Sequence, residues 1–409
     1  MASNCRFCST PLEHELVDLG LSPISNAFIS PDEASQDEPF YPLRAFVCSD
    51  CFLVQLEEFE SPAEIFSDYV YFSSYSDSWL AHARQFVIGA AERFELGPDS
   101  LVIEVASNDG YLLQYFKEQN VPALGIEPAS NVAEVARDAG IETIDEFFGV
   151  ALAERLRDEG RVCDLLVGNN VLAHVPDIND FVGGLAIVLS KSGVLSVEFP
   201  HLLKLIEQTQ FDTIYHEHFS YLSLLTVRRI FAHHGLQVFD VEELTTHGGS
   251  LRVTAQHTDG SHAQSVAVEK VLGDERNARL DSIDGYQNFS QKVSKIKDDL
   301  LQFLDGARSR GERVIGYGAP AKGNTLLNFC GIGPDSIQYT VDRSPYKQGR
   351  LLPGTHIPVH APERIAETQP DYVLILPWNL QDEIVEQMSH VREWGGKFVV
   401  PIPELRVIE

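Results

Sequence analysis

Short apolar runs alternate with helix-like stretches in the middle of the chain. After residue 197 this order changes, because a helical stretch at 224–234 leads to two strand-like runs, 237–241 and 251–255, with no helix between them. Alternating buried strands and helices indicate a parallel sheet with crossover helices, and we expect the last two runs to add an antiparallel pair at its edge. The strand-like runs of the parallel part are 101–106, 123–126, 163–167 and 194–197.

The same rhythm of strands and helices starts again at Arg313. Between the two parts, residues 262–310 are polar with helical spacing, which predicts a connecting helical segment. We expect three domains: a small irregular one at 1–66, an α/β domain at 67–285 and a second, Rossmann-like α/β domain at 286–409. The strand-like runs of the last domain are 314–317, 337–341, 372–376 and 398–400.

Four of the six cysteines form two pairs at the same short spacing, Cys5-x-x-Cys8 and Cys48-x-x-Cys51. This spacing lets four thiolates hold one tetrahedral zinc ion, and four sulfurs leave no open coordination position for catalysis. We therefore predict a structural Zn²⁺ that stabilises the N-terminal domain. Cys163 and Cys330 stand alone in apolar surroundings, and we expect them to be buried thiols.

The charge of the chain limits its partners. Sixty acidic residues face 31 basic ones among 409, which disfavours nucleic acid and acidic membranes. No apolar run approaches the roughly 20 residues of a membrane span, and residues 1–8 lack the features of a secretory signal. We expect a cytoplasmic protein that is a monomer or a weak oligomer. An anionic small molecule stays possible, because a helix N-terminus and local cations can hold a phosphate.

A first nucleotide-type site is predicted where the strand at 101–106 ends. Small residues at 106–110 let the backbone approach a ligand there. Glu127 follows the next strand at the distance typical of an acid that binds a ribose. Together these features resemble the class I methyltransferases that bind S-adenosylmethionine; Phe148 lies where a ring can cover adenine, although core packing explains it equally well. The candidate cofactor residues are Glu104, Ala106, Ser107, Asn108, Gly110, Glu127, Phe148, Asn169 and Asn170.

The segment Tyr215-His216-Glu217-His218-Phe219 follows the fifth strand and carries candidate chemistry. Methylation of a sugar carbon requires a carbanion, and a neighbouring ketone makes the carbon acidic enough for a base to remove its proton. A histidine base, a carboxylate that orients it and a phenol that donates to the enolate supply the needed groups. A metal site at His216, Glu217 and His218, or purely structural hydrogen bonds, are the alternatives.

Two further segments place candidate groups near this motif. His174 follows the fourth strand and lies on the same rim of the predicted sheet, and Tyr69 belongs to a tyrosine-rich stretch at 68–75 just before the middle domain. We expect these segments to meet in one pocket.

A second glycine-rich turn lies at 316–325. Gly316, Gly318 and Ala321 match the dinucleotide-binding pattern with alanine at its last position. Lys322 and the helix N-terminus are placed to hold a pyrophosphate, and Asp342 to hold a ribose. The chain thus offers one site for a methyl donor and one for a nucleotide-linked substrate. The candidate substrate residues are Glu198, Gly318, Ala319, Lys322, Asn324, Asp342 and Trp378.

Taken together, these motifs resemble the sugar C-methyltransferases of antibiotic deoxysugar pathways, specifically the C-3 methyltransferases that act on dTDP-4-keto sugars. The resemblance covers almost the whole chain in order. The motifs that carry it are the paired cysteines, Glu104–Gly110, Asn169–Pro176, Tyr215–Phe219, Gly316–Asn328 and Pro377-Trp378-Asn379.

The resemblance implies a role for each matched residue. His218 is the general base, with Tyr215 and Glu217 beside it and His174 near the sugar, and Tyr69 is the N-terminal phenol at the site. The C-terminal domain binds the sugar nucleotide and not NAD. Because the family also contains C-5 methyltransferases, the methylated carbon stays open.

Other functions are compatible with parts of the pattern. An NAD-dependent oxidoreductase using the turn at 316–321 leaves the middle domain and the zinc module without a role. A non-enzymatic zinc scaffold and an O-methyltransferase are the remaining alternatives.

Overall fold

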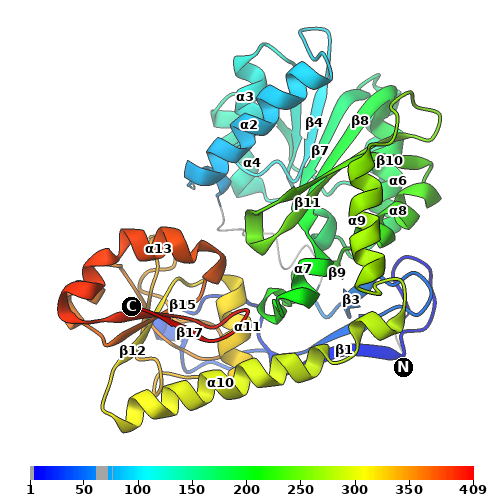
Figure 1. Cartoon of the computed structure of the whole chain (residues 1–409). Coiled ribbons are helices and arrows are strands. Elements are labelled where there is room, and N and C mark those ends of the chain that lie inside the picture. Colours follow the sequence, from blue (N-terminus) through cyan, green and yellow to red (C-terminus); the bar gives the residue numbers. More distant parts are fainter. Residues whose placement is uncertain (1–3, 61–71, 76) are drawn as a thin grey trace.

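The computed structural model describes residues 4–60, 72–75 and 77–409. These residues form three sheets of four, seven and six strands. In Figure 1 the seven-stranded sheet and its helices lie above the small N-terminal sheet, and the C-terminal domain lies beside both, with the long helix α10 running beneath. In the described ranges, no helix combines the length and apolarity needed to cross a bilayer.

The N-terminal sheet contains β1 (His14–Ser22), β2 (Tyr41–Val47) and β3 (Val54–Leu56) in antiparallel pairs. Its fourth strand is β9 (Ser220–Tyr221), which pairs with β3 and comes directly after the Tyr-His-Glu-His segment. A strand of the middle domain therefore completes the sheet of the cysteine-bearing domain. This pairing attaches the Tyr-His-Glu-His segment to the N-terminal sheet.

The middle sheet has the order β10-β11-β8-β7-β4-β5-β6. Five neighbouring strands, from β8 to β6, are parallel, and the expected antiparallel pair closes the edge. The central strands are almost wholly buried, as apolar runs covered by helices on both faces require. The strands are β4 (Val102–Val105), β5 (Ala123–Ile126), β6 (Glu142–Ile144), β7 (Cys163–Asn169), β8 (Leu189–Pro200), β10 (Leu236–Leu244) and β11 (Ser250–His257).

Helices cover both faces of the middle sheet, and together with its parallel strands they confirm the predicted α/β class. They are α2 (Asp77–Arg93), α3 (Leu113–Glu118), α4 (Ser130–Asp138), α5 (Val150–Asp158), α6 (Ile178–Val188), α7 (Leu202–Glu207), α8 (Leu224–His233) and α9 (Val266–Asn277).

The expected connecting segment contains α9 and α10 (Phe289–Ser309). Buried residues of α10 recur every three or four positions, at Val293, Ile296, Leu300 and Leu304, which is the pattern of a helix with one apolar face. This face packs into a core that contains residues of both the N-terminal sheet and the C-terminal domain. Helix α10 is thus more than a connection, because it joins the two flanking domains.

The C-terminal sheet has the order β14-β13-β12-β15-β16-β17, parallel except for β17. Its strands are β12 (Val314–Tyr317), β13 (Thr340–Val341), β14 (Val359–His360), β15 (Tyr372–Ile375), β16 (Lys397–Val400) and β17 (Arg406–Ile408). The short edge strands β14 and β17 have no counterpart among the predicted runs. The helices of this domain are α11 (Ala321–Cys330), α12 (Arg364–Thr368) and α13 (Gln381–Gln387).

Candidate active site

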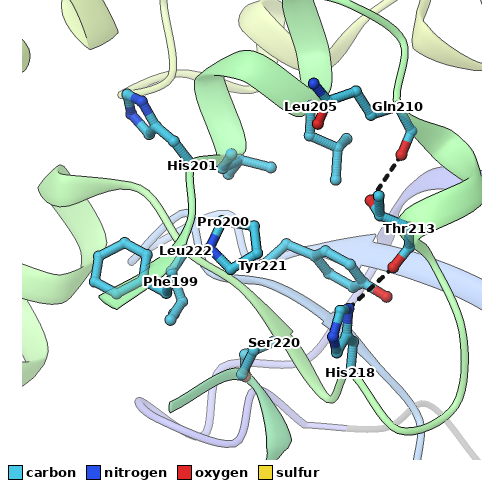
Figure 2. Close-up of a pocket in the computed structure, with 12 residues that line it drawn as sticks. Phe199, Pro200, His201, Leu205, Gln210, Thr213, His218, Ser220, Tyr221 and Leu222 are labelled. Atoms are coloured by element: carbon cyan, nitrogen blue, oxygen red, sulfur yellow. Dashed lines mark hydrogen bonds between the residues drawn. The ribbon is translucent and has the colours of Figure 1, made fainter. Parts of the chain in front are cut away.

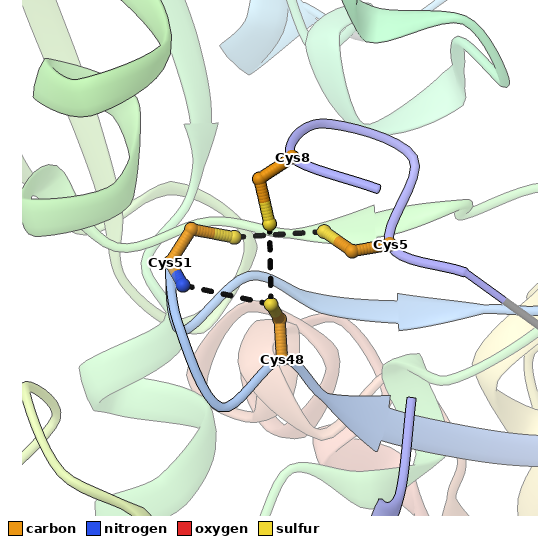
Figure 3. A group of neighbouring side chains, drawn as sticks. All are labelled: Cys5, Cys8, Cys48 and Cys51. Carbon is orange, nitrogen blue, oxygen red and sulfur yellow. Dashed lines mark hydrogen bonds between the residues drawn. The ribbon is translucent and has the colours of Figure 1, made fainter. Parts of the chain in front are cut away.

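The four paired cysteines meet at one point (Figure 3), and their sulfur atoms all lie within 4.8 Å of one another. Each pair sits on the same kind of turn. The N–H of Ser9 donates to the Cys5 carbonyl at 2.9 Å, and the N–H of Phe52 donates to the Cys48 carbonyl at 3.1 Å. The amide of Gln55 also donates to Cys5 Sγ at 3.2 Å, as a thiolate favours. This donor set fits a tetrahedral zinc ion.

The two remaining cysteines are buried away from this cluster, as expected. Burial raises the pKa of Cys330 to about 12 and that of Cys163 further, which keeps both thiols protonated and unreactive.

The predicted cofactor turn follows β4. Ala106, Asn108 and Gly110 all have left-handed backbone conformations, with φ of 57°, 50° and 79°. The Glu127 carboxylate, at the end of β5, accepts hydrogen bonds from the N–H groups of Asn108 at 3.0 Å and Ala129 at 2.9 Å. Glu127 therefore braces the turn from the neighbouring strand. A Cβ atom at Gly110 would lie 3.1 Å from Ile141, so the turn also packs closely.

Several polar atoms around this turn are buried without a hydrogen-bond partner among the described residues: Ser107 Oγ, Asp109 Oδ1, Asn169 Oδ1 and Asn170 Oδ1. A buried polar group without a partner costs about 1–3 kcal/mol, so such a cluster indicates a ligand. S-adenosylmethionine carries an ammonium group, ribose hydroxyls and an adenine amino group, all of which donate. The residues present therefore fit this cofactor.

Glu104 and Phe148 are less open to a ligand than expected. The Glu104 side chain is 1% exposed, and burial raises its pKa well above the usual value, against a hydrogen bond with Tyr111 that lowers it. The Phe148 ring packs edge-on against Phe181, with the ring centres 5.5 Å apart. The contact that Phe148 makes in this structure is therefore one of core packing.

His218 is held between two oxygen atoms of its own segment. Its Nδ1 lies 3.0 Å from the Thr213 carbonyl oxygen, and its Nε2 lies 2.9 Å from the Tyr215 hydroxyl. A carbonyl can only accept, so Nδ1 carries the proton, and Nε2 keeps a lone pair that accepts from the phenol. His218 is therefore held in one tautomer, with Nε2 unprotonated.

His174 lies beside His218 as expected, with the ring centres 4.6 Å apart. Its Nδ1 donates to the Glu217 carbonyl oxygen at 2.7 Å. Burial and the neighbouring His174 lower the pKa of His218 well below the usual value, and burial lowers that of His174 to about 4. Both rings are neutral at physiological pH.

We expected the Glu217 carboxylate to orient the histidine base, but in this structure another group occupies that position. The Thr213 carbonyl orients His218, whereas Glu217 Oε1 accepts from Asn26 Nδ2 of the N-terminal domain at 3.1 Å. Burial raises the pKa of Glu217 to about 7. The reason is the turn itself, since it directs the Glu217 side chain toward the N-terminal domain and only its carbonyl toward His174.

The alternative of a metal site at His216 and His218 finds no support. His216 faces the N-terminal domain, where its Nε2 lies 3.2 Å from the Pro42 carbonyl oxygen. Among the described residues, the four cysteines are the only group of three or more potential ligands that lie close together.

A small pocket adjoins His218 on the side of β8, α7 and β9 (Figure 2). Phe199, Leu205 and Leu222 form apolar walls, and Thr213 and His218 line one side. Apolar walls keep water from the imidazole, which is why burial is the main cause of its lowered pKa.

Lys322 does not extend over the glycine-rich turn as expected. Its Nζ donates to Asn379 Oδ1 at 2.8 Å and lies 4.6 Å from the centre of the Trp378 ring. Trp378 Nε1 in turn donates to Asp212 Oδ2 at 2.7 Å, in the segment that precedes the catalytic motif. Burial raises the pKa of Asp212 to about 6, and the Lys322 charge opposes this. Lys322 therefore faces the middle domain, where its charge also lowers the pKa of His218.

Three expected substrate residues instead hold the structure together. Glu198 accepts from Arg252 Nε at 2.7 Å, Asn324 donates to the Ser25 carbonyl at 2.6 Å, and Trp378 donates to Asp212. All three side chains are nearly fully buried. We expected them to contact the substrate because polar residues often line binding sites, and in this structure each makes a contact between elements of the protein.

The glycine-rich turn before α11 is also closed. A Cβ atom at Gly318 would lie 2.5 Å from Pro377, and the Ala319 N–H donates to Asp342 Oδ2 at 2.7 Å. Asp342 thus braces this turn as Glu127 braces the first. The remaining expected residue, Tyr69, lies outside the described residues.

Three residues near the site had not been singled out from the sequence. Asn26 holds Glu217, Trp79 lies 6.0 Å from the Tyr111 ring, and His247 lies 3.4 Å from Asn170. For His247 a signal existed, because it precedes the pair Gly248–Gly249.

Three family models match consecutive parts of the chain. A zinc binding domain matches residues 5–66, a methyltransferase domain matches residues 79–241, and a C-methyltransferase C-terminal domain matches residues 245–403. The protein named C-methyltransferase NovU, from Streptomyces niveus, is 36% identical over 404 residues, which cover 99% of this chain and 96% of NovU.

Solved structures match about half of the chain at low identity. The PH0226 protein from Pyrococcus horikoshii OT3 is 13% identical with a TM-score of 0.39, over 49% of this chain and 100% of that one. Magnesium protoporphyrin IX methyltransferase from Synechocystis PCC 6803 with bound SAH is 15% identical with a TM-score of 0.36, over 48% and 92%. From its family matches and its near full-length relative, the chain belongs to the C-methyltransferase family that includes NovU, as an S-adenosylmethionine-dependent enzyme with an N-terminal zinc-binding domain.

Proposed function

We propose that this enzyme methylates the carbon next to the ketone of a dTDP-4-keto-deoxysugar, at C-3, in deoxysugar biosynthesis. The observation that carries the proposal is the neutral His218, whose Nε2 lone pair accepts from Tyr215 beside His174. Zinc thiolates need a reducing compartment, so we place the reaction in the cytoplasm.

His218 takes the proton in this reaction. The proton on the carbon beside the ketone moves to Nε2, the C–H electron pair forms a C=C bond, and the carbonyl electron pair moves to oxygen. Tyr215 is within reach to stabilise the base, and the Thr213 carbonyl stabilises the imidazolium through Nδ1–H. When bound, S-adenosylmethionine supplies an electrophilic methyl group for the enolate carbon.

The geometry disfavours the NAD-dependent alternative. In a dinucleotide site the glycine turn stays open, so that its backbone can approach the pyrophosphate. Here Pro377 covers Gly318, and Asp342 takes the Ala319 N–H.

The proposal is tested with wild-type protein, S-adenosylmethionine and a panel of dTDP-4-keto-6-deoxysugars, with products identified by mass spectrometry and NMR. We expect a new C-methyl group at C-3, and exchange of that ring proton in D2O without the methyl donor. An O-methyl product, or no transfer to any sugar of the panel, would refute the proposal.

The base is tested with His218→Asn. The asparagine amide matches Nδ1 and can keep the bond to Thr213, but nothing replaces Nε2. We expect methylation and proton exchange to fall about 100-fold or more, with S-adenosylmethionine affinity retained in calorimetry. His257→Asn, a half-buried histidine at the far end of β11, serves as the matched control. Unchanged exchange in His218→Asn contradicts this assignment.

A further inference from the structure

The turn between β10 and β11 holds a histidine in an uncommon backbone conformation. His247 has φ 55° and ψ 17°, and Gly248 and Gly249 follow with φ of 91° and 116°. Residues other than glycine rarely adopt positive φ, and such strain persists only where the surroundings hold it, often at functional sites.

Two domains hold this turn in place. A Cβ atom at Gly248 would lie 2.5 Å from the Trp378 ring, and one at Gly249 would lie 2.7 Å from Lys204 of α7. Gln210 Nε2 also donates to the Gly248 carbonyl at 2.8 Å. The close packing requires both glycines, and it fixes where His247 lies.

The His247 side chain lies between the cofactor turn and the catalytic histidines. On one side it contacts Trp79, with the ring centres 5.5 Å apart, and Trp79 also lies beside Tyr111 of the cofactor turn. On the other side it is close enough to His218 for the two rings to affect each other's charge. His247 also keeps contact with solvent, so a ligand can reach it.

The hydrogen bond with Asn170 determines where the imidazole carries its proton. His247 Nε2 lies 3.4 Å from Asn170 Nδ2. An amide nitrogen can only donate, so Nε2 accepts, and the proton of the neutral ring is on Nδ1. The neutral ring is a weak base but a good N–H donor toward a developing oxyanion.

We propose that His247 donates a hydrogen bond from Nδ1 to the ketone oxygen of the bound sugar. This inference rests on the proposed function and adds a residue to it. As His218 Nε2 takes the proton from the neighbouring carbon, negative charge develops on the ketone oxygen. His247 stabilises that charge and keeps its own proton, so no further reactant is needed.

The test compares His247→Gly with His247→Asn. Both residues tolerate positive φ, so neither adds backbone strain. The asparagine amide nitrogen matches Nδ1 as a donor, whereas glycine leaves no donor. We expect kcat of His247→Gly to fall about 100-fold, with KM and the Kd of S-adenosylmethionine within a few-fold of wild type. His247→Asn is expected to recover at least tenfold.

The same ratio is expected for proton exchange in D2O with the dTDP-4-keto-6-deoxysugars alone, because the donor acts before methyl transfer. Thermal melting of both variants at or above the wild-type temperature excludes a loss of folding. His257→Asn is again the control.

The outcomes separate this inference from the function on which it rests. If the wild-type enzyme methylates the sugar and His247→Gly is equally active, the inference about His247 fails and the proposed function stands. Equal losses in His247→Gly and His247→Asn, with or without lower melting temperatures, also overturn it, since the donor then does not matter. Wild-type protein that neither exchanges nor methylates any sugar overturns the proposed function and this inference together.

Discussion

At the scale of single residues, the site combines neutral imidazoles with carboxyl groups that burial makes weak acids. The pKa of His174 is lowered to about 4, whereas those of Asp212 and Glu217 are raised to about 6 and 7. Burial is the main cause of all three shifts, and it favours the uncharged form each time. A site with little net charge suits a reaction in which charge moves from carbon to oxygen.

Glu217 provides a test of this view through stability. Its pKa is about 7 in the folded protein and about 4.5 ordinarily, so between these values the folded state holds a proton that the unfolded state has lost. The free energy of unfolding therefore falls as pH rises through this window, by about 3 kcal/mol at most. The glutamine side chain in Glu217→Gln is neutral at every pH, so the free energy of unfolding of this variant does not fall in this way.

We expect Glu217→Gln to gain stability over wild type progressively from pH 5 to pH 8 in urea unfolding. A difference between the two proteins that stays constant over this range would contradict the raised pKa.

At the scale of elements, the two Rossmann-like domains brace their first turns in the same way. An acid at the end of the second strand accepts the N–H of a residue in the turn: Glu127 from Asn108 at 3.0 Å, and Asp342 from Ala319 at 2.7 Å. In the middle domain, buried polar atoms remain around the braced turn for a ligand. In the C-terminal domain Pro377 packs against Gly318 and closes the turn. The bond from Ala319 to Asp342 therefore stabilises the turn itself.

We predict that Asp342→Ala destabilises the protein by about 1–3 kcal/mol, because the buried Ala319 N–H loses its acceptor. Asp342 Oδ1 also accepts from the Ser344 N–H at 2.8 Å, so the following loop loses support too. Differential scanning calorimetry measures the change, and Asp382→Ala, at an exposed position in α13, is the control. An unchanged melting temperature in Asp342→Ala would show that the brace adds nothing.

The sequence predicts elements well where one local pattern decides them. The apolar strands β4, β5, β7 and β12 lie where their runs predicted, and the spacing of the cysteines was enough to predict their cluster. The two-residue strands β9 and β14 are too short to leave any periodicity. Their pairing depends on distant partners.

The same reason explains why contacts within the site are hard to predict. Whether a polar side chain meets a ligand or another domain depends on tertiary packing, and Asn324 and Trp378, which we expect to bind substrate, also make contacts between domains. Contacts such as that of Asn26 with Glu217 link residues 191 positions apart. No local pattern predicts them.

At the scale of the whole molecule, residues 212–221, which contain the Tyr-His-Glu-His segment, are the place where all three domains meet. The N-terminal domain contributes the pairing of β3 with β9 and the bond from Asn26 to Glu217. The C-terminal domain adds the bond from Thr325 to the Ile214 carbonyl at 3.0 Å and that from Trp378 to Asp212. The position of His218 therefore depends on elements that carry no catalytic group.

Zinc removal tests this dependence. The cysteines pack into the same core as the middle domain, and a zinc ion held by the four thiolates would link the two cysteine turns. Treatment with a strong chelator, or Cys48→Ser, is expected to abolish proton exchange and methyl transfer while S-adenosylmethionine binding survives, because the cofactor turn is braced by Glu127 of the middle domain. Cys163→Ala, which alters a buried thiol outside the cluster, is expected to keep activity, and added Zn²⁺ is expected to restore the chelated protein. Full activity without zinc would mean that β9 and the Tyr-His-Glu-His segment keep their positions unaided.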